Sequence, residues 1–134
     1  MARYVIDAPT LVYLVDAGLH VAPGHQLVAP HSIRSEALEL LLLDVRSGQR
    51  TEAAALKAHE RMTGIKIRLL GDRVSRGVAW QVAREHDWDT LRDAEHLALT
   101  RLQADALVTV DPRLAAAAQD AVAVAAIDVL LTAG

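Results

Sequence analysis

Four acidic residues stand where the chain leaves a predicted strand or enters a predicted helix. Asp7 directly follows a short apolar run, and Asp111 directly follows the apolar run 106–110. Glu36 and Asp93 each fall in the first turn of a predicted helix. Neighbouring carboxylates resist ionising together, and a bound divalent cation removes that difficulty. Oxygen ligands suit Mg²⁺ or Mn²⁺. Such an ion activates water and stabilises the charge that develops in phosphodiester cleavage.

The elements that position these acids follow from the apolar periodicity of the sequence. Strands are predicted at 4–6, 26–29, 66–70, 106–110 and 122–127, and helices from Leu11 to a stop at Gly18 and at 33–46, 52–62, 73–86, 91–103 and 112–119. Strands that alternate with helices predict an α/β fold with a parallel sheet covered on both faces. Ligands bind outside the carboxyl ends of the strands in such sheets, so we expect the four acids to converge at that edge.

Each acid also has a purely structural explanation. Asp7 and Asp111 can cap the helices that follow them, and the segment 90–93 resembles a capping box with Asp in place of Glu. Ser32 can cap the helix that contains Glu36, and Glu36 itself is favoured by the helix dipole. The shared edge of the sheet is what favours a joint site over four separate caps.

Composition restricts the class of protein. The 134 residues suit a single domain spanning 1–134 with one ordinary core. The net charge of −3 weighs against a dedicated nucleic-acid-coating module, although it leaves room for an enzyme that holds nucleic acid through metal ions. The absence of cysteine excludes disulfides and thiolate metal sites. No targeting or membrane-spanning segment is visible, so we expect a cytoplasmic protein without membrane attachment.

The acids lie in four segments that resemble the motifs of PIN-domain ribonucleases. These segments are Tyr4-Val5-Ile6-Asp7-Ala8, Ser35-Glu36, Asp93-Ala94 and Val108-Thr109-Val110-Asp111-Pro112-Arg113-Leu114. The small single-domain length resembles the VapC-type toxins of toxin–antitoxin pairs. The resemblance covers essentially the whole chain. It implies a PIN-like three-layer α/β/α fold with a central parallel sheet of four to five strands.

The resemblance also implies an activity and partners. The chain would be a Mg²⁺- or Mn²⁺-dependent endoribonuclease in which Asp7, Glu36, Asp93 and Asp111 match the catalytic, metal-binding acids of the family. Thr109 matches a position that often carries a hydroxyl supporting the site. The family further implies a cognate antitoxin, a homodimer, and structured RNA such as tRNA or rRNA as substrate.

One position departs from the family pattern. Family members commonly carry Ser or Thr two residues after the first Asp, where this chain has Pro9, followed by Thr10. Proline offers neither a hydroxyl nor an N–H group. Either Thr10 takes over the supporting role, or Asp7 is supported in another way. The alternative function is a catalytically weak or inactive PIN-like binding or regulatory module that acts through a protein partner.

Other residues are weighed beside the acids. Arg34, Arg92 and Arg113 lie one or two residues from a proposed site acid and are candidate phosphate contacts, although balance of surface charge explains each equally well. His96 is interpreted as a packing histidine. The leucine-rich segment 38–45 predicts a helix buried on more than one face, and its excess of apolar residues could also mark an interface.

Overall fold

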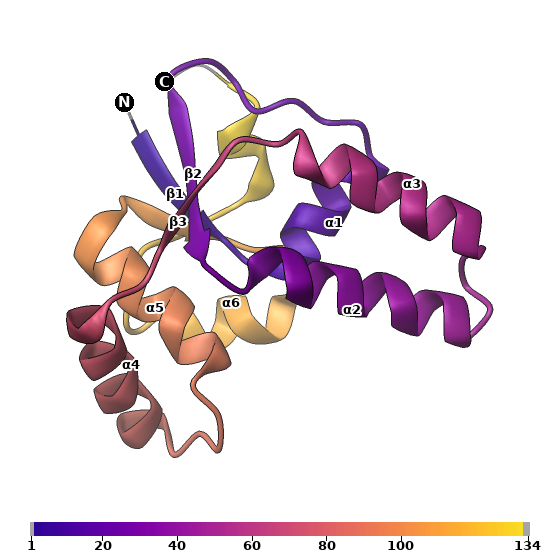
Figure 1. Ribbon diagram of the computed structural model, residues 1–134. Helices are drawn as coiled ribbons and strands as arrows, with labels where there is room; N and C mark the ends of the chain where they lie inside the picture. The colour runs from indigo at the N-terminus through magenta and orange to yellow at the C-terminus, as the bar shows by residue number, and fades with distance from the viewer. Residues whose placement is uncertain (1, 133–134) are drawn as a thin grey trace.

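A five-stranded parallel sheet lies at the centre of the computed structural model, which describes residues 2–132 (Figure 1). The strands are β1 (Ala2–Ile6), β2 (His25–Pro30), β3 (Ile67–Leu70), β4 (Ala106–Val108) and β5 (Val124–Ala125). Their order is β3-β2-β1-β4-β5, and every neighbouring pair is parallel. The chain therefore winds outward from β1 in both directions, and the strand order reverses between β1 and β4.

Helices cover both faces of the sheet (Figure 1). The helices are α1 (Ala8–Asp16), α2 (Ile33–Arg46), α3 (Glu52–Thr63), α4 (Arg73–His86), α5 (Arg92–Gln103) and α6 (Pro112–Ala118), with a 3-10 turn η1 (Ile127–Leu130). The first three helices and η1 pack on one face, and the last three helices pack on the other. The predicted α/β architecture of three layers, with a sheet of four to five strands, is confirmed.

The central strand β1 shows why both faces are covered. Tyr4 and Ile6 point into the core beneath α1, α2 and α3, and Val5 points into the core beneath α4, α5 and α6. Successive side chains of a strand alternate between faces, so an unbroken apolar run requires an apolar layer on each side. Both layers are mainly aliphatic, with side chains such as Leu41 and Leu97 fully buried.

Two strands are shorter than the sequence pattern predicts. The strand predicted at 106–110 ends at Val108. Beyond it, the Thr109 hydroxyl donates to the Asp7 carboxylate, and the Val110 N–H donates to the Thr10 hydroxyl rather than to a neighbouring strand. The strand predicted at 122–127 is reduced to β5, which pairs through two residues only. Its apolar continuation folds into η1, which buries Leu130.

Two helix starts also differ from prediction. Ser32 occupies the N-cap position of α2, but its hydroxyl makes no capping bond and donates to the Glu36 carboxylate at 2.8 Å instead. The capping box predicted at 90–93 is not formed, because α5 begins after Leu91, without a side-chain cap. In both places the acid forms an ion pair with an arginine of another helix: Glu36 with Arg92 and Asp93 with Arg113.

Helix α2 is buried along a single stripe. Ile33, Ala37 and Leu41 are buried, whereas Leu42 and Leu43 are each 55% exposed. The prediction that this helix is buried on more than one face is therefore wrong, and its additional leucines form an exposed apolar surface. None of the helices in residues 2–132 is long and apolar enough to cross a membrane.

Adjacent leucines of α2 provide a matched test of this packing. We expect Leu41→Ala to lower the free energy of unfolding by about 2–5 kcal/mol, because it opens a cavity in the core. Leu42→Ala should change it by less than about 0.5 kcal/mol, because that side chain is largely exposed. Urea denaturation of both variants measures the difference, and equal costs would contradict the observed orientation of α2.

Candidate active site

Asp7 is a buried carboxylate at the end of the central strand. It is 4% exposed and lies at the N-cap of α1, where an extended backbone directs its side chain at the N-terminal turn of that helix. Its Oδ1 accepts hydrogen bonds from the Thr10 backbone N–H and from the Thr10 hydroxyl. Pro9 fits this turn, because the first residues of a helix have no intrahelical acceptor for their N–H groups.

Thr10 and Thr109 connect Asp7 to the neighbouring strand β4. Thr109 Oγ1 donates to Asp7 Oδ2 at 2.7 Å and accepts from the Asp111 N–H at 3.0 Å. The Thr10 hydroxyl accepts from the Val110 N–H at 3.0 Å. Thr10 is fully buried. Two threonine hydroxyls thus join the ends of β1 and β4 and hold both oxygens of Asp7 in place.

Asp111 and Asp93 share one arginine. Asp111 caps α6 by accepting from the Arg113 N–H at 2.9 Å. The Arg113 guanidinium lies 3.0 Å from Asp93 Oδ2 and 3.4 Å from Asp111 Oδ2. The hydrogen bond to Asp93, supported by the charges of both acids, raises the pKa of Arg113. The Arg113 side chain therefore links the first turn of α5 to the first turn of α6.

Glu36 is held from two sides. Its Oε2 accepts from the Ser32 hydroxyl at 2.8 Å, and its Oε1 lies 3.4 Å from Nε of Arg92. Arg92 directly precedes Asp93 on α5. The ion pair of Arg92 with Glu36 and the ion pair of Asp93 with Arg113 therefore connect Glu36 to the other acids through α5. Sequence analysis missed the role of Ser32, although its spacing of four residues from Glu36 is the signal that could have revealed it.

The surroundings of the Asp7 carboxylate suit a bound cation. All its hydrogen-bond donors are neutral, and within residues 2–132 no basic side chain forms an ion pair with it. A buried carboxylate without a counter-charge is costly, and an ionised one has lone pairs left for a metal. In the same part of the chain no three acidic or histidine side chains are grouped closely enough to hold an ion. Arg92 and Arg113 contact the other three acids instead.

The remaining predicted residues lie apart from this network. Arg34 donates to the carbonyl oxygen of Ile65 at 3.0 Å, and among the described residues it contacts none of the four acids. His96 is 3% exposed, and its Nδ1 lies 2.8 Å from the carbonyl oxygen of Arg92. Of the three arginines considered, only Arg92 and Arg113 contact site acids.

Solved structures share this architecture. PAE2754 from Pyrobaculum aerophilum superposes with a TM-score of 0.72 over 97% of this chain and 93% of that chain, at 23% sequence identity. The fold is PIN-like. VapBC-1 from nontypeable Haemophilus influenzae superposes with a TM-score of 0.57 over 92% of this chain and 97% of that chain, at 13% identity. No protein-family model and no curated protein matches the sequence. The similarity to these solved structures is therefore one of fold.

Thr10 provides a test of the hydroxyl link between Asp7 and the end of β4. We expect Thr10→Val to lower the free energy of unfolding by about 1–3 kcal/mol, because it removes a donor to Asp7 and leaves the Val110 N–H without its acceptor. Thr10→Ser retains the hydroxyl and should restore most of that loss. Urea denaturation of the two variants measures the difference, and equal losses would show that the methyl group matters rather than the hydroxyl.

Proposed function

We propose that this chain is a metal-dependent endoribonuclease. The observation that carries the proposal is the buried Asp7 carboxylate, which has neutral donors only and lies where the strand order reverses. Ligand sites of parallel sheets lie at such a point. Asp7, Glu36, Asp93 and Asp111 would hold Mg²⁺ or Mn²⁺. A bound ion of this kind supplies Lewis acidity toward phosphate oxygens and makes water a better nucleophile at neutral pH.

The chain's own groups have separate roles in this proposal. Thr10 and Thr109 fix the orientation of Asp7, and Ser32 fixes that of Glu36. Arg92 and Arg113 are 69% and 66% exposed, so their guanidinium groups can turn from the carboxylates to phosphate oxygens of RNA. Because the chain carries a net charge of −3, these local positive charges are needed to hold a polyanion.

The partners belong to the same proposal. The sequence motifs resemble those of PIN-domain ribonucleases, and the small single-domain length resembles VapC-type toxins. The fold is similar to that of a structure described as VapBC-1. We infer a role as the toxin of a toxin–antitoxin pair that acts on structured RNA such as tRNA or rRNA. The exposed leucines of α2, with Tyr13 of α1 at 45% exposure, offer apolar surface for an antitoxin or a second copy of the chain.

One observation favours the alternative of an inactive module that acts through a protein partner. Arg92 and Arg113 already form ion pairs with three of the four acids, and among residues 2–132 no three acidic or histidine side chains are grouped closely enough to hold an ion. A permanent arrangement of this kind would serve structure rather than catalysis. Metal binding separates the two functions, because only the nuclease must exchange these ion pairs for a cation.

Cleavage of total tRNA and rRNA by the purified chain tests the nuclease. We expect cleavage with Mg²⁺ or Mn²⁺ and none with EDTA. Asp7→Asn should reduce the rate by about 100-fold or more, since loss of even an outer-shell partner weakens metal sites by about 10–100-fold. Calorimetry should show weaker Mn²⁺ binding by the same variant. A variant that cleaves as fast as the wild type would refute the site.

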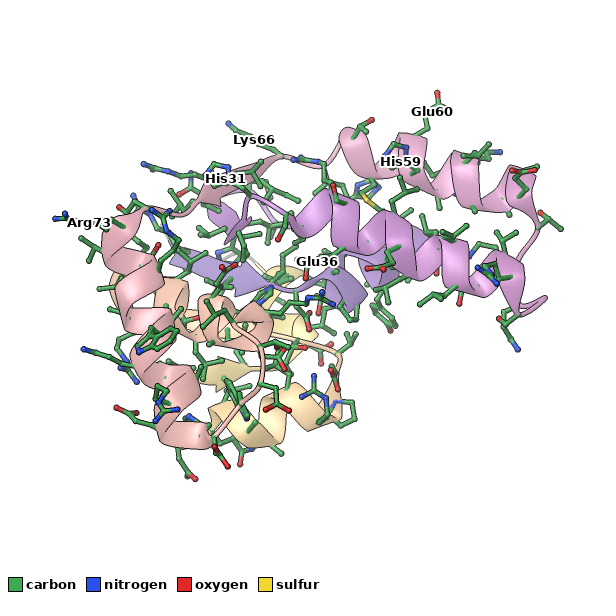
Figure 2. The ribbon with its side chains drawn as sticks, turned by 60° about the horizontal axis from the view of Figure 1, so that its bottom comes forward. His31, Glu36, His59, Glu60, Lys66 and Arg73 are labelled. Carbon is green, nitrogen blue, oxygen red and sulfur yellow. The ribbon has the colours of Figure 1, made fainter. Side chains whose placement is uncertain are left out.

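Two glutamates provide a matched control. Glu36 lies at the centre of the molecule in Figure 2, whereas Glu60 on α3 points outward from its upper edge and is exposed. Glu36→Gln should reduce both cleavage and Mn²⁺ affinity, and Glu60→Gln should change neither. Equal effects would show a general response to lost negative charge rather than a role of the site.

The antitoxin proposal has its own test. We expect a short open reading frame directly upstream of the gene, because toxins of this type are paired with their antitoxins. Its product, co-expressed with this chain, should co-purify with it and suppress RNA cleavage. A solitary gene, or a neighbouring gene product that neither binds this chain nor inhibits its cleavage of RNA, would contradict the toxin–antitoxin pairing. The nuclease proposal would then be judged by the RNA cleavage assay alone.

A further inference from the structure

A cavity lies next to Glu36, at the carboxyl ends of β2 and β3. It is a solvent-open cavity of about 260 Å³ between the loop after β2, the start of α4 and one side of α5. Pro30 and Leu70, which are paired in the sheet as the last residues of β2 and β3, are among the residues that line it. The cavity therefore opens at the same edge of the sheet as Asp7 and Asp111.

Ser32 connects this cavity to the proposed active site. Ser32 lines the cavity, and its hydroxyl donates to Glu36 Oε2 at 2.8 Å. In the view of Figure 2, His31 lies between Glu36 and Arg73, on the side of Lys66, and the Arg73 side chain points outward. A polynucleotide that passes the acids along this edge would next meet the cavity, with basic groups beyond it.

The chemistry of the lining suits a flat, polar heterocycle. Leu70 and the buried Leu99 provide apolar surface. The Glu95 carboxylate and the His31 imidazole add polar groups, and Glu95 forms no ion pair with a basic side chain of residues 2–132. Drug-sized ligands occupy pockets of about 300–1,000 Å³, so a smaller cavity matches a single nucleobase. Unstacked RNA bases are recognised by apolar contact and by hydrogen bonds to their edges.

We propose that this cavity is a nucleobase subsite for a nucleotide that flanks the scissile phosphate. Glu95 accepts hydrogen bonds from the N–H edge of the base, and Arg76, which is exposed at the rim, contacts the attached phosphate. Guanine is the best match, because its adjacent N1–H and N2–H groups face both oxygens of a carboxylate, whereas uracil presents one N–H only. The assignment rests on the proposed nuclease function for its place in RNA cleavage.

Binding of nucleoside monophosphates tests the subsite without cleavage. GMP and UMP are titrated into the full chain in EDTA, and backbone amide shifts are followed by NMR. We expect GMP to move the amides of His31, Gly71 and Leu99 and to bind about fivefold or more tightly than UMP. Glu95→Gln should abolish that preference, and Glu85→Gln, an exposed residue of α4 outside the cavity, should retain it.

A second arm examines the phosphate contact. Arg76→Ala should weaken the binding of GMP about threefold, in the range of an exposed charge pair. It should leave the affinity for guanosine, which has no phosphate, unchanged. Absence of shifts at the cavity, equal binding of GMP and UMP, or an unaltered preference in Glu95→Gln would overturn the subsite.

RNA cleavage by the same variants separates this proposal from the nuclease itself. We expect wild-type products to be enriched in guanine at one fixed position near the cut. Glu95→Gln should lose most of the enrichment and retain cleavage, and Glu85→Gln should match the wild type. An unaltered enrichment in Glu95→Gln would overturn the subsite alone. Absence of cleavage by every variant, together with guanine-selective shifts at the cavity, would overturn the nuclease and leave the base-binding cavity in place.

Discussion

The carboxylate of Asp7 imposes the constraint on which the surrounding structure depends. A negative charge that is 4% exposed must be matched by donors, and here they come from two threonines on different elements. To supply them, α1 must begin directly after β1, and β4 must leave the sheet at Val108 so that Thr109 can turn toward β1. The same bonds place Asp111 at the start of α6. One buried carboxylate thus links the ends of two paired central strands and fixes the position of Asp111 relative to Asp7.

The outer acids are balanced in a different way. Glu36, Asp93 and Asp111 are partly exposed, and each lies against an arginine that is itself about two-thirds exposed. Such pairs are weak, because water screens them and the long side chains lose freedom when they are held. The inner carboxylate is therefore fixed and the outer three are adjustable. An arrangement of this kind suits a site whose cationic partner can be exchanged between guanidinium and metal.

Much of this organisation could be predicted from the sequence, because apolar periodicity and the residues that begin or end helices and strands act locally. The bounds of α2 and α4 match the prediction, and the caps of Asp7 and Asp111 were visible in their spacing. Interactions between distant segments could not be predicted. Asp93 contacts Arg113 rather than the start of α5, so the expected capping box is absent. The cavity beside Ser32 depends on how α4 and α5 pack, which no local pattern encodes.

The charge of the whole molecule is a poor guide to this edge of the sheet. The chain carries a net charge of −3, yet α1, α2, α4 and α6 all begin just after strand ends, and α5 begins against Glu36. Helix N-termini carry partial positive charge. Arg73 and Arg76 open α4, Arg92 opens α5, and Arg113 lies in the first turn of α6. These arginines and helix N-termini therefore place positive charge at the same edge of the sheet as the four acids. In the proposed nuclease, a polyanion would be attracted to this edge of an acidic protein, because arginines and helix N-termini lie there beside the acids.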